Sequence, residues 1–282
     1  MANIFDGIDH CVILVRNLDI AREKMLRLGF TVTPRGTHSK NMGTQNHCMM
    51  LKNGYFEILG ISHSTNFNED WRAKLKHREG LEAVPLASEN VDQLRDQLYD
   101  RGIELPETIE FSRPVNLSGK PSEAKFRLVM VPDKYSPNMS TFVIQHLTRK
   151  VVWNPKYLDH ANGAIGVQSV TGIHKEPHEI ITSYKKLFGE HALSVFENGI
   201  QINTGKGKIN FVTPSAYTKL FPNISTDPIA RPPYLAALSI NVTDLQLTSD
   251  YFLHQGVECF TSPRDTICIP PLSACGTLIE FT

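Results

Sequence analysis

The sequence has no net charge, no long apolar run and few cysteines, and each of these absences argues against a class of protein. Its 29 Lys and Arg residues balance 29 Asp and Glu residues, so no overall charge draws the chain to nucleic acid or to an anionic membrane. No apolar run approaches the ~20 residues that span a bilayer. The first residues also lack the basic and apolar regions of a signal peptide. We therefore expect a cytoplasmic globular protein.

The cysteine spacing and the absence of common catalytic motifs exclude several kinds of metal site and active site. The five cysteines are an odd number without C-x-x-C spacing, which argues against a zinc cluster and against a disulfide framework. The sequence also has no G-x-G-x-x-G opening a helix, no G-x-S-x-G and no H-E-x-x-H. Any chemistry must therefore come from residues that only the fold brings together.

The stretch from Gly7 to Gly60 predicts a β-α-β-β-β unit. Its expected elements are a strand over residues 8–15, a helix over 18–28, a strand opening at residue 30, and a hairpin of 46–51 and 55–59. Gly29 follows the helix, as expected for a residue in the left-handed conformation. Asn53-Gly54 between two apolar runs is a strong hairpin signal, because both turn positions need positive φ.

The same order of elements recurs three more times along the chain. Expected helices over 91–101, 178–188 and 245–254 are each followed by a glycine and by strands, and each is preceded by a strand, over 82–87, 166–171 and 235–242. Such self-similarity indicates a modular architecture. We therefore predict an α+β protein of four tandem βαβββ modules, paired into two domains. Their expected limits are 1–148 and 164–282, joined by a connector over 149–163. Residues 104–121 and 215–233 are expected to be irregular, the first as a loop over a cleft.

In the first unit, side-chain alternation assigns residues to faces. With Asn53-Gly54 as the turn, Glu57 is expected opposite Met50, on the same side as Cys48 and Asn46. His47 is expected on the other face. Glu57 lies in an otherwise apolar strand, where a buried carboxylate must be paired, coordinated or protonated.

Paired modules with a first-strand His10 and a last-strand Glu57 resemble the vicinal oxygen chelate superfamily, most closely its glyoxalase-like branch. The superfamily includes glyoxalase I, extradiol dioxygenases, methylmalonyl-CoA epimerase and bleomycin-resistance proteins. The resemblance covers about residues 5–165, and the second half shares only the shape of its modules. The matching motifs are Ile8-Asp9-His10, the LGFTVTP run over 28–34, GTQN over 43–46, Tyr55-Phe56-Glu57, Gln145-His146, Trp153, His160 and Asn162-Gly163.

The resemblance implies two sheets that form an open cup around a divalent metal ion (Zn, Mn, Ni or Fe). Its implied ligands are His10, Glu57, Gln145 and His146. An offset of 73 residues between the first two modules places Ala83 where a second histidine would stand, which argues against an extradiol dioxygenase. Imidazole and carboxylate are ligands that suit such a metal, with positions left open for substrate oxygens.

The implied function is that of a lyase or isomerase, in which a metal chelates vicinal oxygens of a small oxygenated substrate. His10 and Glu57 would be catalytic, and without a metal Glu57 becomes a candidate general base. The candidate substrate-binding residues are Asn46, Thr44, Arg127 and Trp153. Three alternatives stay open: a bleomycin-resistance-like binding protein, a dioxygenase with a degenerate ligand set, and a structural module. The expected partner is a small molecule, with neither nucleic acid nor membrane, and the chain could form a homodimer.

Overall fold

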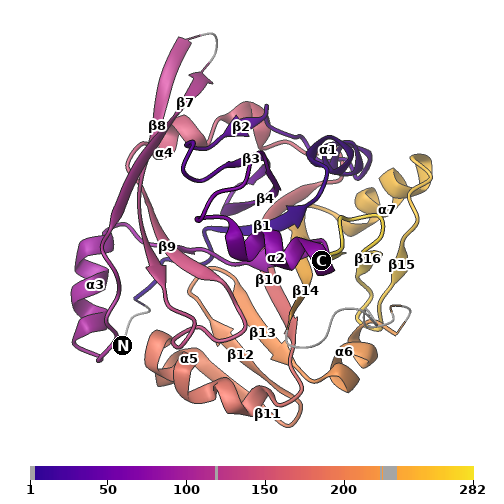
Figure 1. Ribbon diagram of the computed structural model, residues 1–282. Coiled ribbons are helices and arrows are strands. Elements are labelled where there is room, and N and C mark those ends of the chain that lie inside the picture. Colours follow the sequence, from indigo (N-terminus) through magenta and orange to yellow (C-terminus); the bar gives the residue numbers. More distant parts are fainter. Residues whose placement is uncertain (1–3, 118–119, 223, 225–233) are drawn as a thin grey trace.

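The computed structural model describes residues 4–117, 120–222, 224 and 234–282 as a mixed α+β protein (Figure 1). The first half contains β1 (His10–Val15), α1 (Leu18–Arg27), β2 (Gly36–Thr37), β3 (Thr44–Leu51), β4 (Gly54–Ile61), α2 (Glu69–His77), β5 (Gly80–Ala83), β6 (Leu86–Ala87), α3 (Val91–Tyr99), β7 (Ile109–Leu117), β8 (Lys120–Val131) and β9 (Thr141–His146). The predicted α+β class is confirmed.

The connector and the second half also contain both helices and strands. They contain α4 (Arg149–Val152), η1 (Pro155–Tyr157), β10 (Ala164–Ile173), η2 (Pro177–Ile180), α5 (Ile181–Phe188), η3 (Glu190–Ala192), β11 (Leu193–Phe196), β12 (Gly199–Asn203), β13 (Lys208–Val212), α6 (Pro214–Leu220), β14 (Tyr234–Val242), α7 (Leu245–His254), β15 (Phe260–Thr261), β16 (Ile267–Ile269) and β17 (Leu278–Phe281). None of the helices in the described ranges is long and apolar enough to cross a membrane.

The first and last strands of each expected module pair in parallel. These pairs are β1 with β4, β6 with β9, β10 with β13 and β14 with β17. The strands form a five-stranded sheet in the order β2-β3-β4-β1-β5, a four-stranded sheet in the order β6-β9-β8-β7, and an eight-stranded sheet that contains β10 to β17. The five-stranded and four-stranded sheets, both built by the first half, are the two that enclose a large cavity.

Local signals set the limits of α1. The Asn17 side chain accepts hydrogen bonds from the backbone N–H groups of Asp19 and Ile20, which caps the helix N-terminus. The helix buries Ala21 and Met25 against the sheet. Gly29 has φ +83°, a conformation that favours glycine, and it turns the chain out of the helix.

The hairpin of β3 and β4 forms as expected, but its register differs from the prediction by two residues. The turn is made by Lys52 and Asn53, because β3 ends at Leu51 and β4 begins at Gly54. Glu57 therefore lies opposite Cys48 and not opposite Met50. A shift of two residues keeps every side chain on its predicted face, because side chains alternate with a period of two.

Two expectations for the second module were wrong. Residues 104–121 were expected to form a loop, but β7 pairs with β8 over nine positions and builds the tall hairpin at the top left of Figure 1. The expected strand over 82–87 is divided into β5 and β6, which belong to two different sheets. Much of the stretch 215–233 lies outside the described residues, and its first part forms α6.

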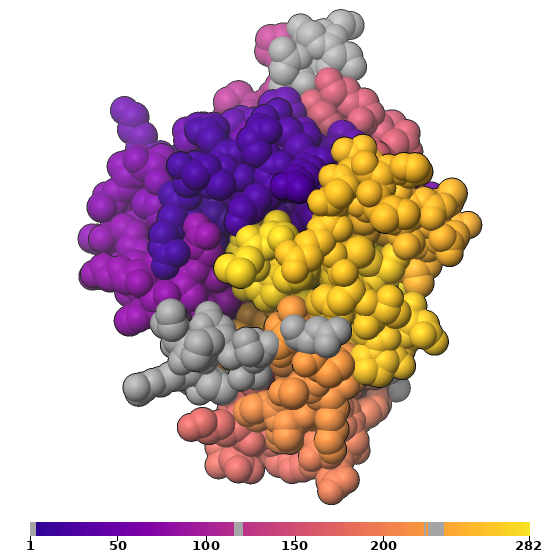
Figure 2. Space-filling model, turned by 90° about the vertical axis from the view of Figure 1, so that its right-hand side faces the viewer, coloured from indigo at the N-terminus to yellow at the C-terminus, as the bar shows by residue number. Residues whose placement is uncertain are grey.

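The two halves share one hydrophobic core, and hydrogen bonds join them. Ile8 N donates to the Lys206 carbonyl, and Lys52 N donates to the Ile165 carbonyl, each at 2.9 Å. The Tyr184 hydroxyl donates to the Pro137 carbonyl at 2.8 Å. Figure 2 shows the C-terminal residues packed directly against the N-terminal ones. The second half therefore supports the sheet that carries the site.

Candidate functional site

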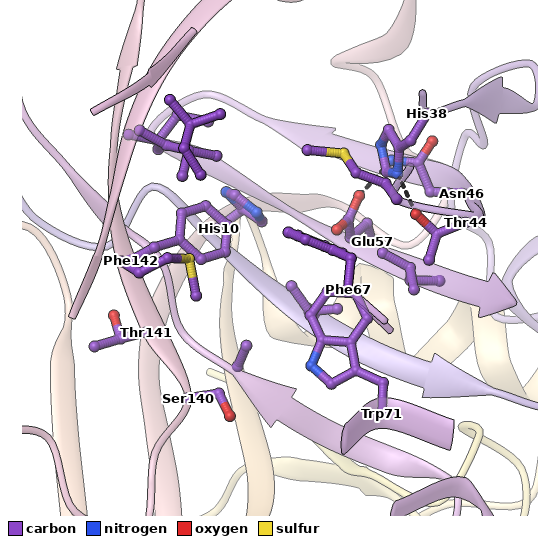
Figure 3. A pocket seen from close by; sticks show the side chains of 18 of the residues that line it. His10, His38, Thr44, Asn46, Glu57, Phe67, Trp71, Ser140, Thr141 and Phe142 are labelled. Carbon is purple, nitrogen blue, oxygen red and sulfur yellow. Dashed lines mark hydrogen bonds between the residues drawn. The ribbon is translucent and has the colours of Figure 1, made fainter. Parts of the chain in front are cut away.

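A cavity of about 800 Å³ lies between the five-stranded and four-stranded sheets, and α2 contributes to its wall. Its walls are largely aromatic and aliphatic, and its polar groups include His10, His38, Asn46 and Glu57. Figure 3 shows His10 and Glu57 on the same side of this space, with His38, Thr44 and Asn46 gathered near Glu57 and Phe142 near His10. Volume and lining are typical of a site for a small organic molecule.

His10 is held by a buried carboxylate. Its Nδ1 lies 2.7 Å from Asp9 Oδ1, and its ring stacks on Tyr55 with centroids 4.4 Å apart. Burial alone would raise the pKa of Asp9, but the charge of His146 and the hydrogen bonds from His10 and His146 outweigh it and hold that pKa well below its usual range. An ionised Asp9 can only accept, so His10 Nδ1 donates. In the neutral ring Nε2 is then the unprotonated nitrogen.

Glu57 is 5% exposed, and its position at the cavity wall follows from strand alternation in β4, where Tyr55, Glu57 and Leu59 line the cavity. Its Oε2 accepts a hydrogen bond from Asn46 Nδ2. Asn46 is itself buried, and its Oδ1 has no hydrogen-bond partner among the residues that the structure describes. The carboxylate is thus oriented by one amide and otherwise faces the cavity.

His38 is a third titratable group at this end of the cavity. Its Nδ1 lies 2.7 Å from the Thr44 hydroxyl. Burial lowers the pKa of His38, and the nearby Glu57 carboxylate offsets part of that effect. We conclude that His38 is neutral at pH 7 and can accept a proton. Thr44 and Asn46, both expected to bind substrate, do line the cavity.

The pairing of first and last strands identifies the second-module counterparts of His10 and Glu57. In the first module His10 pairs with Tyr55 and Val12 with Glu57. In the second, Ala83 bridges to Ser140 and Leu86 pairs with Val143. The counterpart of His10 is therefore Ala83, as the sequence offset predicts, and the counterpart of Glu57 is Phe142. Both line the cavity, and the Phe142 ring lies edge-on to His10 with centroids 5.7 Å apart.

The structure does not bring Gln145 and His146 to the cavity. Gln145 lies on the opposite face of β9, where its side chain donates to the Glu89 carbonyl and accepts from Val91 N at the start of α3. His146 is on the inner face, but its Nε2 bonds Asp9 at 3.0–3.1 Å and its ring lies against Trp153. The physical reason is register, because the position on β9 that is equivalent to Glu57 lies three or four residues earlier, at Phe142.

The remaining substrate candidates also lie outside the cavity lining. Arg127 lies on the outer face of β8, between Asp92 and Glu110. Trp153 packs against Tyr55 and His146 beside the cavity, and its Nε1 donates to the Leu51 carbonyl at 3.0 Å. Both residues have structural partners that account for their side chains.

The expected four-ligand metal centre does not fit these residues. Within the described part of the chain, no group of three or more His, Cys, Asp or Glu side chains could hold a metal ion. His10 and Glu57 supply two suitable donors, but the other two counterpart positions carry the methyl group of Ala83 and the ring of Phe142. We therefore derive no reaction step through a metal.

Two functional residues were missed at the sequence level. Asp9 belongs to the Ile8-Asp9-His10 motif, but its place between two imidazoles follows only from the packing of β1 against β9. Arg113 lines the cavity from β7, within the stretch that was expected to be a loop. A weak signal for it exists, since Ile109, Phe111 and Arg113 alternate with polar residues as strand residues do.

The fold is shared with several solved structures of low sequence identity. A hypothetical protein from Staphylococcus aureus aligns over 98% of both chains, with 12% identity and a TM-score of 0.69. A mutant of 4-hydroxymandelate synthase from Streptomyces coelicolor aligns over 98% of this chain and 92% of its own, with 10% identity and a TM-score of 0.59. The Mn(II)-bound glyoxalase from Novosphingobium aromaticivorans aligns over 99% and 82%, with 9% identity and a TM-score of 0.55.

At these identities the structures establish the fold alone. Among curated protein sequences, none matches this chain. The glyoxalase-like domain family matches residues 8–188, which is more than half of the chain and includes every cavity residue discussed above. The protein belongs to the glyoxalase-like domain family of the vicinal oxygen chelate superfamily.

Proposed function

We propose that this protein is a lyase or isomerase that moves a proton on a small oxygenated molecule held in the cavity, with Glu57 as the base. The observation that supports this most is Glu57 itself. It is a buried carboxylate on the wall of a cavity of about 800 Å³, and its one side-chain hydrogen bond within the described residues comes from Asn46. Burial of a carboxylate beside an open cavity is costly unless a ligand or a proton compensates.

The neighbouring imidazoles of His10 and His38 complete the set of acid–base groups at the cavity. A substrate C–H placed against Glu57 would lose its proton to the carboxylate, and a positioned general base of this kind contributes 10²–10⁴-fold. His10 and His38 each present a second ring nitrogen that makes no hydrogen bond with any residue described here. Either ring can take up or return a proton at another atom of the substrate. Asp9 keeps the His10 ring in one orientation.

The test is enzyme-catalysed exchange of substrate hydrogens in D₂O, followed by proton NMR across a panel of small carbonyl and hydroxycarbonyl compounds. We expect wild type to exchange at least one member, and Glu57→Gln to exchange it at least about 100-fold more slowly. Glu123→Gln, a change at an exposed carboxylate on β8, is the matched control and should exchange like wild type. Equal rates for Glu57→Gln and wild type would refute the role of Glu57.

A binding protein that sequesters a ligand without turnover is the second candidate. It is favoured by Ala83 and Phe142, which replace two potential ligands by apolar groups at the centre of the cavity. The same panel separates the two functions. A compound that binds to the cavity but undergoes no exchange in wild type would support sequestration and contradict catalysis.

A further inference from the structure

β7 places one basic side chain in a cavity that is otherwise mainly apolar. Ile109, Phe111 and Arg113 line the cavity, whereas the intervening Glu110 and Ser112 bond partners on the outer face. This alternation is that of a regular strand, and the nine-residue pairing with β8 fixes its register. The inward position of Arg113 is therefore a consequence of the sheet and not of a loop conformation.

Arg113 has no acidic partner in direct contact among the residues that the structure describes, unlike Arg127. Arg127, on the outer face of the same hairpin, pairs with Asp92 and Glu110. Arg113 makes no ion pair with any residue in the described ranges, and its closest recorded aromatic neighbour is the Phe126 ring, 6.0 Å from the guanidinium carbon. A partly buried cation with no acidic group in direct contact is compensated only in part for its lost solvation. An anionic ligand would supply that compensation.

A second polar group beside Arg113 is also unsatisfied. A side chain built at Gly36 would collide with Asn46 Oδ1 and would lie 2.8 Å from Arg113 Nη1, so both groups lie against the bare backbone of Gly36. Asn46 Nδ2 donates to Glu57, and the opposite amide orientation would set two acceptors together. Asn46 Oδ1 is buried and without a partner among the described residues, which leaves it to accept from an O–H or N–H of a ligand.

We propose that the cavity binds a carboxylic acid with an apolar, preferably aromatic body, and that Arg113 binds its carboxylate. The aromatic walls hold the body of the molecule, and guanidinium–carboxylate pairing fixes its orientation. Asn46 accepts from a hydroxyl or amine of the same molecule, next to Glu57. This inference deepens the proposed function and rests on the same cavity being the substrate site.

The test compares two probes of nearly the same shape, 2-naphthylacetate and 2-naphthylacetamide, by isothermal titration calorimetry with the full chain at pH 7. We expect wild type to bind the carboxylate at least about tenfold more tightly than the amide. Arg113→Gln should remove that preference while keeping the affinity for the amide. Arg127→Gln, on the outer face of the same hairpin, should keep the wild-type preference.

Equal binding of the two probes by wild type, or a preference that survives Arg113→Gln, would overturn the proposal. Failure of both probes to bind wild type would overturn it as well. These outcomes are separate from the exchange experiment. Carboxylate selectivity without proton exchange would support the anion site and refute the proton-transfer function. Proton exchange without carboxylate selectivity would support the proton-transfer function and refute the anion site. Circular dichroism of each variant shows whether it is folded.

Discussion

Replacing Asp9 by asparagine is expected to destabilise the fold by about 3 kcal/mol, although it changes a single polar atom. Asp9 is 2% exposed and receives hydrogen bonds from His10 Nδ1 at 2.7 Å and His146 Nε2 at 3.0 Å. Hydrogen bonds to a charged group contribute about 1.5–3 kcal/mol each. An asparagine removes the charge, and with its oxygen kept against His10 Nδ1 it sets an N–H group 3.0 Å from His146 Nε2. Breaking one partner of a buried pair typically costs ~3–5 kcal/mol, and the retained bond places this case at the low end.

The dependence of this effect on pH follows from the direction of the pKa shift. Because the folded state holds the pKa of Asp9 below its ordinary value of 3.8, the stabilisation is fully present above that value. It is lost as the pH falls through the folded pKa. The difference in free energy of unfolding between wild type and Asp9→Asn should therefore shrink as the pH falls below about 4.

Urea unfolding followed by circular dichroism measures these free energies. Asp92→Asn is the matched control, because Asp92 is an exposed carboxylate that pairs with Arg127 at the surface, where ion pairs contribute little. A difference of less than about 0.5 kcal/mol between wild type and Asp9→Asn would refute the reasoning. So would an effect of Asp92→Asn that equals that of Asp9→Asn.

Two further predictions test the register and the packing between the halves. The double substitution of Ala83→His and Phe142→Glu should create a site that binds Zn²⁺ or Ni²⁺ stoichiometrically by calorimetry. Wild type has only two suitable donors, so it should keep no stoichiometric metal after dialysis. If wild type keeps a metal that the His10→Ala variant loses, the assignment of Ala83 and Phe142 as the other two counterpart positions is contradicted. Gly276→Ala should cost about 3 kcal/mol in urea unfolding, because Gly276 has φ +78° and a Cβ there would lie 2.7 Å from the Glu79 carbonyl carbon. Gly256→Ala, with φ +59° and nothing within 4 Å, should cost about 1 kcal/mol, and equal costs would disprove the role of the contact.

The sequence was informative about the fold wherever a local signal determines the backbone. The helix after Asn17 ends within one residue of its predicted limit. Gly29 ends it through its own backbone conformation, which does not depend on tertiary contacts. The signals failed at β7, because its proline and polar residues are typical of a loop. β7 is the edge strand of its sheet, and Pro114 is tolerated there because an edge strand can lack a backbone donor. The alternation of Ile109, Phe111 and Arg113 is a weak signal for such a strand, and the packing of the sheet decides it.

For the site, the sequence predicted the first module better than the second. Alternation along β1 and β4 is sufficient to place His10 and Glu57 on the inner face. A fixed difference in residue number then matches His10 to Ala83, because each residue lies at a similar distance before the helix of its module. It cannot carry Glu57 to Phe142, since the long hairpin of β7 and β8 changes the spacing before the last strand. Gln145 and His146 were expected to match Glu57 because they end the last strand of the second module, and backbone pairing was needed to exclude them from the cavity.

A comparison within the chain shows why Glu57, and not the similar Glu280, is the group expected to react. Glu280 pairs with Ser239 in the parallel pair of β14 and β17, as Glu57 pairs with Val12 in β1 and β4. Its two oxygens are bound by Arg264, Thr266 and Ser239, each at 2.6 Å. Such a carboxylate is neutralised and fully hydrogen-bonded, and it has no capacity left for a substrate. Glu57 occupies the equivalent position with one amide as its partner and a cavity before it, so the same strand position is structural in the second half and available for chemistry in the first.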